Sequence, residues 1–162
     1  MMAANPFTPL RSALPFWMPF LLVPLVWFTA IQGGWWLIAV PLTSWWAFAA
    51  LDQITGLNLE NTDPETSDQD LRWHILLTQI WVPVQVITLF GLIWYATRAD
   101  HLSSVEKVGL FFGVGVISGT IGINYSHELM HQQSRLERWL GDILLAMVLY
   151  SHFRSEHLLV HH

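Results

Sequence analysis

The sequence predicts an all-α integral membrane protein, and three observations lead to this fold class. Hydrophobic residues make up 53% of the chain and charged residues 12%, about half the charged share of soluble domains. The stretch from Ser12 to Leu51 carries no charged residue. The chain also contains 10 tryptophans, a residue that concentrates where membranes meet water. We therefore expect a single membrane domain over residues 1–162, with about four transmembrane helices arranged as two hairpins.

The uncharged stretch is long enough for the first two spans, because one crossing of a bilayer needs about 20 apolar residues. A Gln-Gly-Gly turn at residues 32–34 divides it into spans near 13–31 and 35–51. A cleaved signal peptide is the competing interpretation of the first span. Its apolar core is too long for that, and a second span begins at once, so we favour an uncleaved hairpin.

Two further spans follow a polar, acidic loop over residues 52–72. We expect them near 73–97 and 108–125. The fourth span carries five glycines with two G-x-x-x-G spacings, a pattern that lets helices approach closely: Gly109, Gly113, Gly115, Gly119 and Gly122.

Basic residues predict how the hairpins face the membrane. Hairpin topology places the N-terminus, the 52–72 loop and the region 124–162 on one side. That side has five basic residues against two on the other: Arg11, Arg72, Arg135, Arg138 and Arg154 against Arg98 and Lys107. The split predicts that the helical region 124–162 faces the cytoplasm. The net charge of −5 comes without a basic patch, so nucleic-acid binding is not expected.

Six of the eight histidines lie in this last region. His127 and His131 are four residues apart, as are His157 and His161, so each pair points to one side of a helix. His162 adds an imidazole beside the second pair. A lone pair is weak evidence, but two pairs near a membrane span indicate metal binding, because unpaired histidines are costly there. The chain has no cysteine, so a metal would be held by imidazole and carboxylate groups.

The stretch from His127 to His131 also reads H-E-x-x-H, the zinc-protease signature with a glutamate general base. Glu156 would then be the third zinc ligand. A catalytic zinc takes three protein ligands, so this interpretation leaves several histidines unused. Five clustered imidazoles favour two metal ions, although ligand type alone does not separate iron from zinc. His74 and His101 are expected at the membrane surface or in solvent.

The two histidine motifs together resemble a known family. N-x-x-H-E-L-x-H followed by H-F-x-x-E-H-x-x-x-H-H is similar to the integral-membrane alkane 1-monooxygenases of the membrane fatty-acid desaturase and hydroxylase superfamily. Leu51-Asp52-x-x-x-Gly56 and Asn61-x-x-Pro64-Glu65 in the polar loop also resemble this family. The resemblance implies a non-haem diiron enzyme in the bacterial inner membrane, which uses O2 to hydroxylate the terminal carbon of linear alkanes. Electrons would come from rubredoxin and rubredoxin reductase.

Site residues follow from the same resemblance. It implies five metal ligands: His127, His131, His157, His161 and His162. Glu128 and Glu156 match glutamates that we interpret as orienting the imidazoles through their ring N–H groups. Asn124 and His152 are expected to support the ligands without binding metal. Asp52 matches an acidic position to which we assign no role.

The sequence departs from the family pattern at two points. Val160 stands where the second histidine box usually has glycine, which affects how His161 is placed relative to His157. The family has a third histidine box and further spans, and none follows His162 in this sequence. We therefore expect an N-terminal part of such an enzyme, inactive on its own.

Substrate choice is the least constrained of these predictions. We expect Trp45 or Trp46 to limit the length of an alkane that enters between the helices, although both also fit a membrane-interface belt. A fatty-acid desaturase or hydroxylase is the alternative within the superfamily. A membrane zinc metalloprotease and a non-catalytic remnant are alternatives of other classes, and metal analysis distinguishes iron from zinc.

Overall fold

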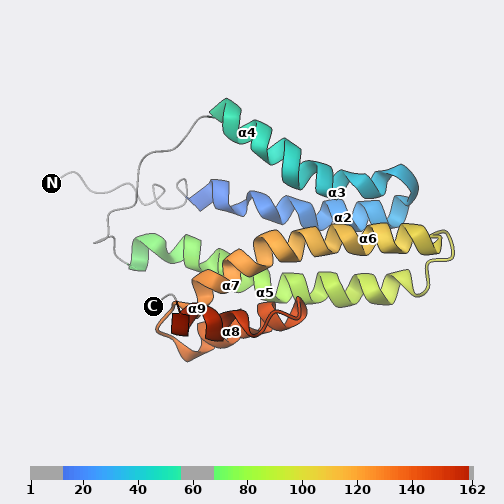
Figure 1. Ribbon diagram of the computed structural model, residues 1–162. Helices are drawn as coiled ribbons and strands as arrows, with labels where there is room; N and C mark the ends of the chain where they lie inside the picture. Colours follow the sequence, from blue (N-terminus) through green and yellow to red (C-terminus); the bar gives the residue numbers. More distant parts are fainter. Residues whose placement is uncertain (1–12, 56–67, 161–162) are drawn as a thin grey trace.

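The computed structural model of the protein describes residues 13–55 and 68–160. All regular secondary structure in these two ranges is helical. Two long hairpins lie side by side, and α8 (Arg135–Met147) and α9 (Phe153–Val160) fold back against one end of them (Figure 1). Four stretches are long and apolar enough to span a membrane: Leu14–Gln32, Gly34–Leu51, Leu71–Ala96 and Ser104–Met130. The predicted all-α membrane fold with two hairpins is therefore confirmed.

The first hairpin has irregular arms joined by a glycine turn. In chain order it contains the 3₁₀ helix η1 (Leu14–Leu21), α2 (Leu22–Gln32), the 3₁₀ helix η2 (Gly34–Ile38), α3 (Ala39–Leu42), the π-helix η3 (Thr43–Ala47) and α4 (Phe48–Thr55). Gly33 and Gly34 have φ angles of +65° and +58°, a region that glycine adopts at no steric cost. The turn lies where the sequence predicts it.

The second hairpin is longer. Its first arm is α5 (Asp68–Ala96), and its second arm runs without a break through α6 (Ser104–Ile117), the π-helix η4 (Ser118–Gly122) and α7 (Ile123–Met130). The loop expected over residues 52–72 is shorter than predicted, because α4 continues to Thr55 and α5 already begins at Asp68. Acidic residues are favourable in a first helical turn, so the polar composition there does not prevent a helix.

Glu106 joins the turns of the two hairpins to each other. These turns lie at the end of the bundle away from α9 (Figure 1). One carboxylate oxygen of Glu106 accepts the backbone N–H of Ser103 at 2.8 Å and its hydroxyl at 2.6 Å. The hydroxyl oxygen of Ser103 in turn accepts the N–H of Glu106 at 3.3 Å, which completes a capping box at the start of α6. The other carboxylate oxygen accepts the N–H of Gly34 at 2.6 Å. Nearby, exposed His101 places Nε2 3.2 Å from the carbonyl oxygen of Ala30. The hairpins are thus joined by polar contacts at their turns as well as by packing.

The outer surface of the hairpins is apolar, as expected of helices that face lipid. Trp35 is 90% exposed, Ile87 67% and Phe90 58%. Together with the four spanning-length helices, this surface identifies the chain as a multi-pass membrane protein.

Glycines of α6 bring the two hairpins into close contact. A Cβ added at Gly113 would lie 3.4 Å from the Cβ of Val40, and one at Gly109 would lie 3.8 Å from Leu37. A Cβ at Gly115 or Gly119 would meet nothing within 4 Å. One of the two G-x-x-x-G spacings therefore makes the predicted close approach, while the other faces open space.

A polar pair lies inside the second hairpin. The indole N–H of buried Trp81 donates to Oε1 of buried Gln85 at 2.6 Å. The Gln85 amide lies against Gly122, where a Cβ would be 2.4 Å from Oε1. Trp81 also contacts the ring of Tyr125, with ring centroids 5.7 Å apart. These contacts fix α5 against η4, the segment from which α7 continues.

Candidate metal centre

α7 carries the first histidine pair. His127 and His131 lie one turn apart, with ring centroids separated by 4.7 Å, and His131 is the residue at which the helix ends. Because α7 continues directly from α6 and η4, the packing of the second hairpin determines where these two side chains lie.

α8 packs antiparallel to α7 (Figure 1). Ser126 is fully buried, and its hydroxyl donates to the carbonyl oxygen of Gly141 at 2.9 Å. A Cβ at Gly141 would lie 3.1 Å from the carbonyl oxygen of Ser126, so glycine allows the two backbones to approach. Ser126 and Gly141 are not among the predicted site residues; small residues on neighbouring helices were the available signal.

A sharp turn then reverses the chain from α8 into α9. The N–H of Tyr150 donates to the carbonyl of Leu145 at 2.9 Å, and that of Leu149 to the carbonyl of Ala146 at 3.1 Å. This is the bonding pattern of a Schellman motif, whose left-handed residue is usually glycine. Here it is Leu149, with φ +56°. The reversal brings α9 back toward the end of α7.

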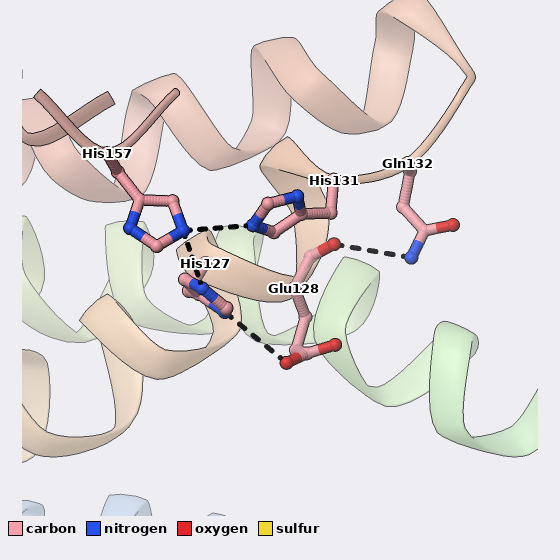
Figure 2. A network of polar contacts seen from close by, with 5 residues as sticks. All are labelled: His127, Glu128, His131, Gln132 and His157. Carbon is pink, nitrogen blue, oxygen red and sulfur yellow. Dashed lines mark hydrogen bonds and ion pairs between the residues drawn. The ribbon is translucent and has the colours of Figure 1, made fainter. Parts of the chain in front are cut away.

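Three of the five predicted ligands converge at this point, as Figure 2 shows. Nε2 of His157 lies 3.0 Å from Nε2 of His127 and 3.1 Å from Nε2 of His131. One ring nitrogen from each residue lies within 4.8 Å of the other two. The ring of Phe153 stacks on His157 at a centroid distance of 5.3 Å. Residues 26 and 30 positions apart are therefore brought together.

The two separations from His157 fit a shared metal ion. Two nitrogens that each lie about 2.1 Å from one metal are roughly 3.0 to 3.4 Å apart at octahedral or tetrahedral angles. His131 is exposed, while His127 and His157 are half-buried, so an ion would have a route in from solvent. Three imidazoles suit iron and zinc alike, so this geometry does not choose between them.

Glu128 lies beside the cluster. Its Oε1 is 3.5 Å from Nδ1 of His127 and its side chain is 65% exposed, while its backbone carbonyl accepts the side-chain amide of Gln132 at 3.2 Å (Figure 2). Nδ1 is the ring nitrogen of His127 that does not face His157. The carboxylate is thus placed to orient this imidazole.

The remaining predicted site residues are not part of the described cluster. His161 and His162 lie outside the described residues, as does the side chain of Asp52. Asn124, Glu156 and His152 are exposed. Within residues 13–55 and 68–160, none of these three forms a hydrogen bond or ion pair with a histidine of the cluster; the ring of His152 contacts Tyr150 instead, at a centroid distance of 4.7 Å.

His74, expected at the membrane surface or in solvent, is packed against a neighbouring helix. It is half-buried near the start of α5, with its ring 5.1 Å from that of Phe16. Its Nδ1 is buried without a hydrogen-bond partner among the described residues. The apolar 3₁₀ helix η1 covers this side of α5, a tertiary contact that its position at a span end does not reveal.

The candidate channel residues Trp45 and Trp46 lie in η3. They are 51% and 71% exposed, and the Trp45 ring lies 6.0 Å from that of Phe112 on α6. Both therefore lie on the outer, apolar surface of the two hairpins.

Comparison with protein families matches residues 107–162 to the fatty acid desaturase family. This segment runs from the start of α6 to the last residue of the sequence and contains all five predicted ligands. No solved structure matches the chain.

Curated relatives cover most of the chain. An alkane 1-monooxygenase 2 of Alcanivorax borkumensis is 30% identical over 162 residues, covering 92% of this chain and 41% of the relative. An alkane 1-monooxygenase 1 of Pseudomonas aeruginosa is 35% identical over 115 residues, covering 69% of this chain and 30% of the relative. An alkane 1-monooxygenase of Pseudomonas putida is 30% identical over 137 residues, covering 82% and 34%. The chain thus spans about two fifths or less of the length of these relatives.

Proposed function

Since the chain belongs to the alkane 1-monooxygenase family of the fatty acid desaturase superfamily, we propose that it supplies part of the metal centre of a membrane non-haem diiron monooxygenase. The reaction is hydroxylation of the terminal carbon of a linear alkane with O2. The observation that carries this proposal is the meeting of His127, His131 and His157 at the end of a helix of membrane-spanning length.

In this proposal each residue type has a defined task. His127, His131 and His157 hold one iron ion, and His161 and His162 contribute to the second. Bound iron supplies the activation of O2. The exposed carboxylate of Glu128 lies 3.5 Å from Nδ1 of His127. It favours the tautomer of His127 that is protonated at Nδ1, which leaves Nε2 of His127 able to bind metal.

The lipid-facing surface supports an apolar substrate. A linear alkane dissolves in the bilayer core and would reach the enzyme from there. The exposed tryptophans of η3 lie on the surface that faces the bilayer in this proposal. We propose that Trp45 or Trp46 limits the chain length that is accepted. The basic residues beside the histidine region support a cytoplasmic face in a bacterial inner membrane, where rubredoxin and its reductase would supply electrons.

Metal analysis tests the proposal. The chain, purified in detergent, is expected to contain iron and to lose the ion held by His127, His131 and His157 when His157 is replaced by alanine. His101→Ala is the matched control, because His101 lies at the opposite end of the bundle. Because the chain is expected to be inactive on its own, the reaction is tested in a complete enzyme that contains this segment, as conversion of a linear alkane to its 1-alcohol with rubredoxin and reductase present.

Three results would contradict this proposal. Zinc bound by the histidines together with peptide hydrolysis would favour the metalloprotease. Introduction of a double bond into an acyl chain, without alcohol formation, would favour a desaturase, the activity named by the matching family. Iron that is retained equally in His157→Ala and His101→Ala would refute the metal site.

A further inference from the structure

A second polar contact lies close to the cluster and is not explained by metal ligation. Arg154 on α9 donates from Nη1 to Oδ2 of Asp142 on α8. The two side chains are 34% and 39% exposed, so the contact is partly sheltered from water. Charge-assisted hydrogen bonds of arginine to carboxylate are among the stronger polar contacts in proteins.

The ion pair affects His157 because Arg154 and His157 lie on the same helix, α9. Arg154 and His157 are three residues apart on α9, so they lie on the same side, one turn from each other. α9 has 8 residues, and a helix this short is not stable in water without tertiary contacts. Contacts on that side therefore determine both whether α9 forms and how it is rotated.

α8 provides a firm base for such a contact. Asp142 directly follows Gly141, the residue whose carbonyl is bonded to buried Ser126 on α7. A side chain that binds Asp142 is therefore held in a fixed position relative to α7, the helix that carries the other two imidazoles. Two hydrogen bonds thus connect α9 to α7 through α8: Arg154 to Asp142, and Ser126 to Gly141.

We propose that Asp142 and Arg154 are positioning residues for the metal centre. Their ion pair holds α9 in the rotation that brings Nε2 of His157 to His127 and His131. The metal-binding part of this inference rests on the proposed function, whereas the placement of α9 does not.

Distance measurement without metal tests the placement. The chain has no cysteine, so spin labels at Ile87→Cys on α5 and Ser155→Cys on α9 are the only ones; both sites are exposed. A narrow distance distribution is expected for the otherwise unsubstituted chain and a broad one for Asp142→Asn. The exchanged pair Asp142→Arg with Arg154→Asp should restore the narrow distribution. Asp100→Asn, which removes the same charge in the exposed turn at the opposite end, is the control and should not broaden it.

Cobalt(II) titration tests the consequence for the site. Asp142→Asn is expected to weaken cobalt binding about fivefold, the effect of losing one partly exposed ion pair, and the exchanged pair should recover it. The ligand-field absorption of bound cobalt should change intensity with the same variants, which a general loss of stability would not produce.

The outcomes separate the two proposals. If Asp142→Asn leaves the distance distribution narrow, or if the exchanged pair restores neither distance nor affinity, the positioning role is refuted. If the unsubstituted chain binds no cobalt while the ion pair still controls the distance, the placement of α9 stands and the proposed metal function fails.

Discussion

Replacement of Gly122 by alanine probes the packing that places α7. In the structure the added Cβ would lie 2.4 Å from Oε1, 2.9 Å from Nε2 and 3.1 Å from Cδ of Gln85. Carbon atoms pack at about 3.5 to 4.0 Å, so either the glutamine or the helix must move by roughly 1 Å. Gln85 cannot swing aside freely, because its Oε1 accepts the indole N–H of buried Trp81.

The expected cost follows from two opposing effects. Overpacking in a core costs about 1 to 3 kcal/mol, while alanine in place of glycine improves helix propensity by about 1 kcal/mol at most. Gly119→Ala, in the same π-helix, gains the propensity and meets no atom within 4 Å. The difference in unfolding free energy between the two variants therefore isolates the overpacking, and we expect about 1 to 3 kcal/mol.

Equilibrium unfolding in detergent micelles measures this difference. When Gly122→Ala is added to a chain that already carries Gln85→Ala, most of the overpacking cost in unfolding free energy should disappear, because the clashing amide is gone. Equal stability of Gly122→Ala and Gly119→Ala would refute the reasoning, as would an undiminished cost in the Gln85→Ala background.

Three further outcomes are expected. Gly33→Ala should destabilise the chain more than Gly34→Ala, because Gly33 has φ +65° and ψ −163°, a region essentially restricted to glycine, and its added Cβ would also lie 3.0 Å from Leu102; equal midpoints in a denaturant titration would contradict this. Leu149→Gly should raise the unfolding free energy by about 0.5 to 1 kcal/mol, because this 90% exposed residue has φ +56°; a lower thermal midpoint would count against it. Trp45→Ala in a complete enzyme of this family should extend the accepted alkane length, and an unchanged product profile would argue that Trp45 does not line the substrate path.

Features that depend on local composition could be predicted from the sequence. The uncharged stretch determines the first two spans, and Gly33 and Gly34 determine the turn between them. The four-residue spacing of His127 and His131 places both on one side of α7. Each of these properties depends on residues that are neighbours in the sequence, so no tertiary contact has to be known to predict it.

Features that depend on tertiary contacts could not be predicted in the same way. The meeting of His157 with the first pair follows from the reversal at Leu149, a residue type that gives no turn signal. The ion pair of Asp142 with Arg154 joins two helices whose relative rotation the sequence does not reveal. The irregular η4 also lacks a composition signal, since glycine, serine and threonine occur in regular membrane helices as well.

The π-helical segment η4 links chain length to the direction in which the histidines point. Each residue of a regular α-helix adds a rotation of about 100°, so a one-residue deletion in α6 would turn His127 and His131 away from α9. A π-helical turn contains one residue more than an α-helical turn. A deletion within η4 can therefore be absorbed by a change to α-helical bonding, and α7 keeps its facing. At η4 the second arm can therefore lose one residue while His127 and His131 still face His157 on α9.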